Sequence, residues 1–328
     1  MGEPPIRLGL IGCDAARCLR ALGRDGGSVL AAFRRSVYLE HDSSGAIACV
    51  GPPALGAGPL NALAGADQAL PDWQDSGLAP GDPVAPEGDG IGIAGRRALT
   101  FRDARLHDPL RGPLSWTKDG LAKALARLSE MLAPFALADG LAPLADPARR
   151  AAPPASPLTE RARPAIAALE SGLAAGTPPP REAVERLVGL GPGLTPSGDD
   201  FLGGMTIALA MSGRAEAAAA LAVPVLEAAP ASTNRISAAH LGAAARGFGA
   251  DALHRALDAM ARGDDRALAA ALRGLDAIGH SSGWDAMAGA VSALRVLAAQ
   301  PATSAAAVSA APALDSATTM PASRSAAT

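Results

Sequence analysis

The first third of the chain consists of short hydrophobic runs that are broken by glycine, proline and aspartate. From about residue 27 to about residue 113 these runs are SVLAAFRRSVYLE, GAIACVGPP and GDPVAPEGDGIGIAGRRALTFRD, a pattern typical of strands separated by turns. The segment HDSSG, residues 41–45, separates two runs and has the composition of a hairpin turn. We therefore predict a small antiparallel β barrel or sandwich, preceded by one short helix at about residues 14–23.

After the segment SWTKDG the spacing of hydrophobic residues becomes helical. Leu121, Leu125, Leu128 and Leu132 follow one another at intervals of four and three, which places them on one face of a helix. Glycine and proline separate further helical segments to about residue 300. The last residues are mostly Ala, Ser, Thr and Pro without periodicity, which predicts a disordered tail.

These patterns predict an α+β protein with an N-terminal small antiparallel β barrel or sandwich, followed by a mainly α-helical C-terminal domain. The expected boundaries are 1–115 for the β-rich domain, 116–300 for the helical domain and 301–328 for the tail. A chain of 328 residues is long enough for about two domains. Aromatic residues make up only 3%, so the core must be built from aliphatic side chains and close helix contacts through Ala and Gly.

Charge and composition argue against several classes of protein. The formal net charge is -3 and no dense run of Lys and Arg occurs, so the electrostatic signature of a nucleic-acid binder is missing. Neither a signal peptide nor an apolar run of about 18 residues is present, which predicts a soluble protein without membrane contact. Cys13, Cys18 and Cys49 lack the spacing of a zinc site or a disulfide framework. We therefore expect a cytoplasmic protein.

Two segments of the predicted helical domain share one pattern. TPSGDDFLGG, residues 195–204, and HSSGWDAMAG, residues 280–289, both contain S-G-x-D-x-(Leu/Met)-x-G. The offset is constant, because 282 − 197 = 85 for the serines and 285 − 200 = 85 for the aspartates. Two such loops indicate either duplication or convergence on one local role.

Helix capping alone would explain part of the pattern. Ser197 with Asp200, and Ser282 with Asp285, have the spacing of a capping box. Capping does not explain the preceding GLGPG, residues 189–193, because three glycines in five residues are needed where the backbone takes a special path or something approaches it closely. A ligand-binding loop is therefore favoured over a simple helix start.

The chemistry of the loops restricts the ligand. Exposed N–H groups at a glycine-rich helix start suit an anion, but Asp199, Asp200 and Asp285 would repel a bare one. A metal ion such as Mg2+ could lie between phosphate and carboxylates, or the ligand could carry N–H donors beside its anionic group, as a carbamoyl or ureido compound does. No certain cofactor follows, and neither a Walker A sequence nor a dinucleotide fingerprint is present.

A third polar cluster lies between the two loops. In PASTNRISAAHL, residues 230–241, Thr233, Arg235 and Ser237 fall where a helix should begin, and Arg235 could pair with a carboxylate or phosphate. Alternatively, Ser232 or Thr233 is a helix cap and Arg235 an ordinary surface residue. His280 is the histidine best placed for proton transfer, although a bond to a turn is an equal alternative. The remaining histidines have no metal-ligand spacing.

The segments GLGPGLTPSGDDFLGG, TNRIS and GHSSGWDAMAG resemble the signature segments of the oxamate carbamoyltransferase subunit AllH family. The resemblance extends from about residue 187 to about residue 297. It implies a cytoplasmic subunit of a three-part carbamoyltransferase of anaerobic allantoin breakdown, which works beside an acyl-CoA-synthetase-like protein and a further subunit. Such an enzyme exchanges oxalurate and phosphate with oxamate and carbamoyl phosphate, and these small molecules combine anionic groups with N–H donors.

With this resemblance, each polar residue receives an expected role. The anion-binding turn would be formed by Gly191, Gly193, Thr195, Ser197 and Gly198. Asp199, Asp200 and Asp285 would orient the carbamoyl NH2 group or hold a metal, and Arg235, flanked by Thr233 and Ser237, would neutralise a carboxylate or phosphate. Donors to the carbonyl oxygen would come from His280, Ser281 and Ser282, next to Gly283.

Two alternatives remain open. The chain could be a non-catalytic scaffold subunit, or one that binds a small carboxylate while the chemistry occurs on a partner. It could also be a Mg2+-dependent phosphoryl-transfer enzyme or hydrolase that uses the aspartates.

Overall fold

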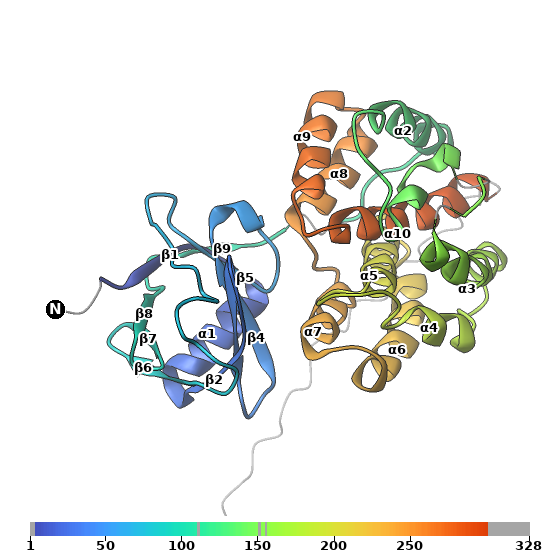
Figure 1. Cartoon of the computed structure of the whole chain (residues 1–328). Helices are drawn as coiled ribbons and strands as arrows, with labels where there is room; N and C mark the ends of the chain where they lie inside the picture. Colours follow the sequence, from blue (N-terminus) through green and yellow to red (C-terminus); the bar gives the residue numbers. More distant parts are fainter. Residues whose placement is uncertain (1–3, 110–111, 150–151, 155, 301–328) are drawn as a thin grey trace, which may run out of the picture.

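The computed structural model describes residues 4–109, 112–149, 152–154 and 156–300. A β barrel is followed by a helical region, which confirms the expected α+β class and the order of its two parts (Figure 1). The predicted tail, 301–328, lies outside the described residues. Within the described ranges, no helix is both long enough and apolar enough to cross a lipid bilayer.

Eight strands close the barrel and a ninth extends it. The strand order is β5-β4-β3-β2-β6-β7-β8-β1-β9, and a β5–β1 pairing closes the ring. The strands are β1 (Ile6–Gly12), β2 (Gly27–Phe33), β3 (Ser36–His41), β4 (Ala46–Gly51), β5 (Asn61–Ala64), β6 (Pro83–Glu87), β7 (Gly90–Ile93), β8 (Arg97–Thr100) and β9 (Arg105–His107).

The barrel is mixed, whereas the sequence predicted a purely antiparallel one. β1 pairs in parallel with β8 and β9, and β4 pairs in parallel with β5. The hairpin predicted at HDSSG is confirmed between β3 and β4, with Gly45 at φ 66°. Parallel pairs arise from crossover connections, and the hydrophobic pattern of a strand does not record which neighbour it will find.

Helix α1 (Cys13–Asp25) follows β1 directly and packs on the barrel, mainly against β4 and β6. Its buried face includes Cys18, Leu19 and Leu22, each with 0% exposure. All three cysteines of the chain are free thiols. The helix extends one residue before and two residues beyond the predicted span 14–23.

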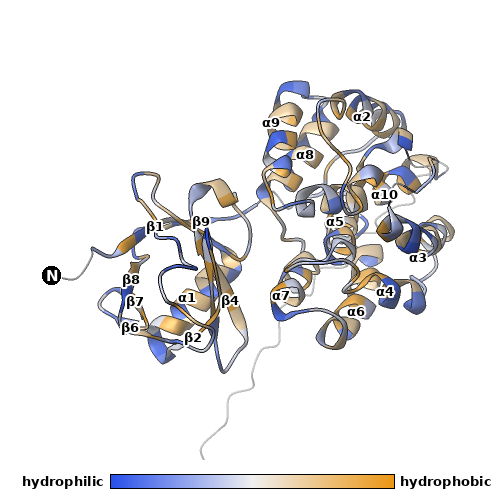
Figure 2. Cartoon of the chain, viewed as in Figure 1, coloured by the Kyte–Doolittle hydropathy of each residue, from blue (hydrophilic) through white to orange (hydrophobic). Residues whose placement is uncertain are grey.

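The helical region contains α2 (Lys118–Met131), α3 (Pro157–Ala175), α4 (Arg181–Leu187), α5 (Ser197–Met211), α6 (Ala215–Ser232), α7 (Arg235–Ala244), α8 (Asp251–Arg262), α9 (Asp265–Asp276) and α10 (Ser282–Ala299). The predicted leucine stripe of α2 is buried, which confirms it. Outer helices such as α9 carry hydrophilic and hydrophobic residues in alternation (Figure 2). α5 and α10, by contrast, consist mostly of buried residues.

α5 and α10 pack with their backbones in direct contact. A Cβ atom added to Gly204 would lie 1.8 Å from the carbonyl oxygen of Ala286, and one added to Gly289 would lie 1.8 Å from that of Phe201. These contacts are related by the same offset of 85 as the two loops, since 289 − 204 = 85 and 286 − 201 = 85. The repeated segments therefore pack on each other as a reciprocal pair, and both helices begin at the same end of that contact.

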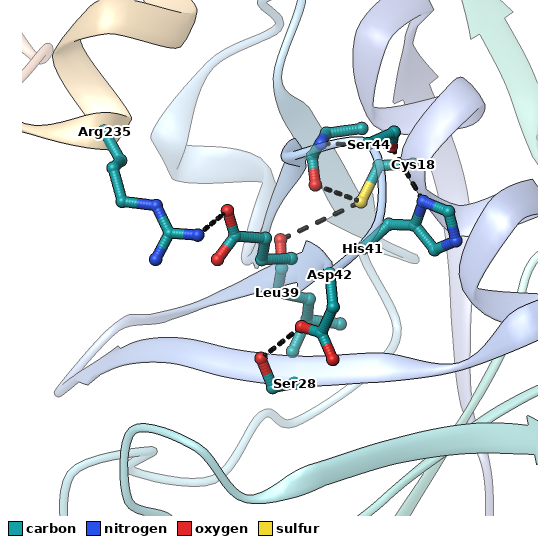
Figure 3. Close-up of polar contacts among 9 residues, drawn as sticks. Cys18, Ser28, Leu39, His41, Asp42, Ser44 and Arg235 are labelled. Atoms are coloured by element: carbon teal, nitrogen blue, oxygen red, sulfur yellow. Dashed lines mark hydrogen bonds and ion pairs between the residues drawn. The ribbon is translucent and has the colours of Figure 1, made fainter. Parts of the chain in front are cut away.

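The barrel is attached to the helical region by polar contacts. The Arg235 guanidinium at the start of α7 pairs with the Glu40 carboxylate on β3, and Figure 3 shows Arg235 extending towards the barrel. Arg246 pairs with Asp14 of α1 at 2.6 Å, and the backbone N–H of Asp251 donates to the Ala57 carbonyl at 2.9 Å. These contacts fix the barrel against α7 and the start of α8.

Candidate functional site

A cavity of about 850 Å3 lies between the barrel and the helical region. Both repeated loops, α5, α7 and residues of β3 and β4 line it. The loops meet directly, because the Thr195 and Ser282 hydroxyl oxygens are 2.7 Å apart. Two segments that are 85 residues apart in the sequence therefore face one ligand-sized space.

The glycine-rich stretch before α5 takes the special backbone path that the sequence predicted. Gly189, Gly191 and Gly193 have φ values of 75°, 122° and 93°, a region that residues with a Cβ atom rarely adopt. Gly193 lines the cavity, whereas a Cβ atom on Gly191 would lie 2.9 Å from the backbone nitrogen of Ser197. The glycines thus permit a tight loop that brings Thr195 to the cavity.

The predicted capping boxes are wrong. Ser197 and Ser282 are the first residues of α5 and α10, and neither helix has a side-chain cap. The N–H groups of Asp199 and Asp200 donate to the Pro196 carbonyl, and that of Gly198 donates to the Leu190 carbonyl. Because the turn itself uses these donors, they are not directed at a ligand.

Gly198 and Gly283 serve packing. A Cβ atom on Gly198 would lie 2.0 Å from the Leu187 carbonyl oxygen, and one on Gly283 would lie 2.1 Å from that of Leu275. Each glycine allows its helix start to press against the end of the preceding helix. This matching environment extends the reciprocal relation between the two loops.

Asp199 fastens the first loop to α7. Its carboxylate accepts hydrogen bonds from the Gly189 N–H at 2.7 Å, from the Ser237 hydroxyl at 2.6 Å and from the Thr233 hydroxyl. Thr233 and Ser237 are thereby occupied within the protein. The cap of α7 is Asn234, which accepts from the Ser237 N–H, and not Ser232 or Thr233 as the alternative interpretation had it.

Asp285 is likewise held by the protein. It is 1% exposed, and its carboxylate accepts from the Leu141 N–H at 2.6 Å and from the Ser281 hydroxyl at 2.8 Å. Burial raises the pKa of Asp285, while hydrogen bonds from Ser281 and Ser197 oppose that rise. Asp285 does not line the cavity.

Asp200 lines the cavity and has an unsatisfied oxygen. Its Oδ2 atom is buried and has no hydrogen-bond partner among the described residues. Burial raises the pKa of the Asp200 carboxyl well above its usual range, and the nearby charge of Asp285 raises it further. Interactions with the Ser282 and Thr195 hydroxyls act in the opposite direction.

The serines and aspartates of the two loops interact crosswise. Ser197 of the first loop stabilises the charge of Asp285 in the second, and Ser282 of the second loop stabilises the charge of Asp200 in the first. The residues of the S-G-x-D pattern are thus directed at the other loop rather than at their own helix start. Only one of the two equivalent aspartates, Asp200, faces the cavity.

Two histidines line the cavity in different settings. His280 lies at its rim with a side chain 90% exposed, 3.7 Å from the Asp139 carboxylate. His240 of α7 lies in the wall, and burial lowers its pKa to about 4, against an opposing effect of Asp14. His240 was not among the residues predicted from the sequence, although it belongs to a helical stripe with Ser237, Leu241 and Ala244 that faces the cavity.

No arginine or lysine lines this cavity in the described part of the chain. Arg235, expected to neutralise a substrate carboxylate or phosphate, pairs with Glu40 outside it. Over the same residues, no three His, Cys, Asp or Glu side chains are grouped so that they could hold a metal ion. The polar lining therefore consists of hydroxyls, acidic side chains, imidazoles, the Asn61 amide and the Cys49 thiol.

The comparison with known families concerns the part of the chain that carries both loops. Residues 187–294 match the family model of the oxamate carbamoyltransferase subunit AllH. This confirms the resemblance to the AllH family. The matched span runs from the end of α4 into α10 and contains the polar residues at the start of α7. The barrel lies outside the matched span. No curated protein and no solved structure matches the chain.

Proposed function

We propose that this chain is the subunit of a carbamoyltransferase that holds the carbamoyl-bearing substrate, oxalurate or oxamate, in the cavity between the barrel and the helices. The observation that carries the proposal is the convergence of both repeated loops on this cavity, with Thr195 and Ser282 2.7 Å apart. The match to the AllH family supports the class of reaction.

The carboxyl of Asp200 is the group that would recognise the carbamoyl end. A protonated carboxyl donates through its O–H and accepts through its other oxygen, which is the complement of a –CO–NH2 group. Burial and Asp285 favour this protonated form by raising the pKa of Asp200. Asp200 lines the cavity, and a ligand that satisfied its unpartnered Oδ2 atom would remove the cost of leaving a buried polar atom without a hydrogen bond.

In the proposed reaction, a phosphate oxygen attacks the ureido carbonyl of oxalurate and the bond from that carbon to the oxamate nitrogen breaks. Negative charge develops on the carbonyl oxygen during the attack. The Asp200 O–H and the Thr195 and Ser282 hydroxyls are hydrogen-bond donors at one wall of the cavity that could stabilise this charge. The departing nitrogen takes up a proton, and oxamate and carbamoyl phosphate are formed.

A phosphate dianion needs positive charge, and this cavity offers no basic side chain among the described residues. We therefore assign the phosphate contacts to a partner subunit, such as the acyl-CoA-synthetase-like protein that the family resemblance implies. In this division the present chain positions and polarises the carbamoyl group.

The test is carbamoyl transfer by the complex reconstituted with its partner subunits. Asp200→Ala removes both the donor and the acceptor of the side chain, so transfer should fall by about a hundredfold, in the range seen when one oxyanion donor is lost. Asp119→Ala, on the exposed first turn of α2, is the matched control and should retain full activity. Unchanged transfer by Asp200→Ala would remove Asp200 from the mechanism.

A second candidate function is a scaffold subunit without a ligand of its own. The N–H groups at the start of α5 are bonded within the turn, which favours this alternative over an anion-binding loop. A scaffold should co-purify with its partners yet show no thermal shift with oxalurate, oxamate or carbamoyl phosphate. A thermal shift that Asp200→Ala abolishes would exclude it.

A further inference from the structure

The cavity changes character along its length. On α5 the lining residues are Ser197, Asp199, Asp200, Gly203, Gly204 and Ile207, and on α7 they are Ser237, His240, Leu241 and Ala244. Both sets have the spacing of one helix face. Each set begins with polar side chains at the helix start and ends with apolar ones two turns later, so the two helices share one polar-to-apolar direction. α5 and α7 are also in contact, since a Cβ atom on Gly203 would lie 3.5 Å from the Cβ atom of Ala244.

Further apolar residues line the cavity. Phe248 follows α7 and Leu253 belongs to α8, while Leu55 and Pro59 come from the barrel side. These segments approach one another closely, because a Cβ atom on Gly249 would lie 2.5 Å from the Ile207 side chain, and one on Gly58 would lie 3.9 Å from the Cα atom of Ala250. The apolar end is therefore lined by residues of both the barrel and the helical region.

The cavity is larger than oxalurate or oxamate requires. A volume of about 850 Å3 is within the range of pockets that bury drug-sized molecules. A molecule as small as oxalurate would occupy the polar end and leave the apolar wall facing water. Apolar surface around a ligand site strengthens binding only if the ligand covers it.

We infer that the apolar end is a second subsite, which receives an aliphatic or aromatic group, so that the preferred ligand is an N-carbamoyl compound with an apolar substituent. The inference rests on the proposed function for the carbamoyl end of the ligand. It adds that recognition depends on two groups, the ureido group at Asp200 and the apolar substituent between Ile207, Phe248 and Leu253. The ligand would then extend from the loops towards the start of α8.

The test is isothermal titration calorimetry of the full chain with oxalurate, N-carbamoylglycine, N-carbamoylleucine and N-carbamoylphenylalanine. Covering an apolar side chain of this size should lower Kd by about tenfold or more from N-carbamoylglycine to N-carbamoylphenylalanine. Phe248→Ala should reduce that preference to about threefold or less. Leu226→Ala, which truncates a leucine that is 41% exposed outside the cavity, is the control and should retain the preference.

A second variant covers the case in which Phe248→Ala does not fold. Ala250 is the N-cap residue of α8 and is partly exposed at the cavity, so Ala250→Leu should fill the apolar end and lower the preference in the same way. Circular dichroism melting of each variant establishes that it is folded. A preference that survives both substitutions would overturn the subsite.

The outcomes separate this inference from the proposed function. If oxalurate binds, Asp200→Ala weakens its binding and the four compounds bind equally, the second subsite is wrong and the proposed function stands. If N-carbamoylphenylalanine binds with a dependence on Phe248 but not on Asp200, the apolar subsite stands and the carbamoyl assignment is wrong. If none of the four compounds binds, both are overturned.

Discussion

Replacing Asp200 by Asn should stabilise the protein at neutral pH. The carboxyl is buried beside Asp285, and its Oδ2 atom lacks a hydrogen-bond partner among the described residues. At neutral pH the folded protein must either bury a negative charge there or keep a proton that the unfolded chain would release. Both cost free energy, and an amide of the same shape avoids the cost.

The sign of the pH dependence follows from the direction of the pKa shift. The pKa of Asp200 is raised in the folded state, so the native protein binds more protons than the unfolded chain at every pH between the ordinary value, near 4, and the folded value. The free energy of unfolding therefore falls as pH rises through this window, by about 1.4 kcal/mol for each pH unit. Below the ordinary pKa both states are protonated, and the penalty is absent.

Thermal unfolding of wild type and Asp200→Asn, followed by circular dichroism between pH 4 and pH 8, measures this effect. The two Tm values should agree near pH 4, and the Tm of the variant should be higher at pH 8. In a cooperative unit of about 200 residues, each kcal/mol of added stability raises Tm by about 2 to 4 °C. Asp119→Asn should show no such divergence. A variant that is less stable than wild type at pH 8 would show that the Asp200 charge is stabilised, which refutes the reasoning.

Three further predictions concern the residues around the cavity. The depressed pKa of His240, about 4, means that stability is lost as pH falls from about 6.5 to about 4; His240→Gln should remove that loss, at most about 3 kcal/mol, in melting curves over the same range. Gly204→Ala and Gly289→Ala should each cost about 3 kcal/mol or more in urea unfolding, because their new Cβ atoms would lie 1.8 Å from carbonyl oxygens. Gly203→Ala, whose nearest neighbour is 3.5 Å away, should be tolerated, and equal costs at all three positions would contradict the close packing of α5 on α10. Arg235→Ala leaves the buried Glu40 carboxylate without its partner and should cost about 1 to 3 kcal/mol, with no change in the Kd of oxalurate; a large rise in that Kd would restore Arg235 to the binding site.

The sequence predicted the parts of the fold that local pattern controls. The strand-rich beginning, the hairpin at residues 41–45 and the leucine stripe of α2 all follow from side-chain period and turn chemistry. The parallel pairs of the barrel did not, because β1 finds its partners β8 and β9 about ninety residues later in the chain. Partner choice over such a distance depends on three-dimensional packing.

The candidate site shows the same division. The repeated S-G-x-D pattern and the glycines before it pointed to the two loops, and the positive φ values explain why those glycines occur. The direction of each side chain was not visible, so residues interpreted as caps of their own helices are directed across to the other loop. Arg235 was expected at the substrate but pairs with Glu40 of the barrel, whereas His240, for which no role was predicted, lines the cavity.

The central claim is that the two loops form one site for the carbamoyl group. A crystal structure of the chain with bound oxalurate tests it most directly. The claim predicts the ureido group of oxalurate within hydrogen-bond distance of the Asp200 carboxyl and of the Thr195 or Ser282 hydroxyl. Oxalurate bound elsewhere on the chain, with the cavity between the loops and the barrel filled by water alone, would contradict it.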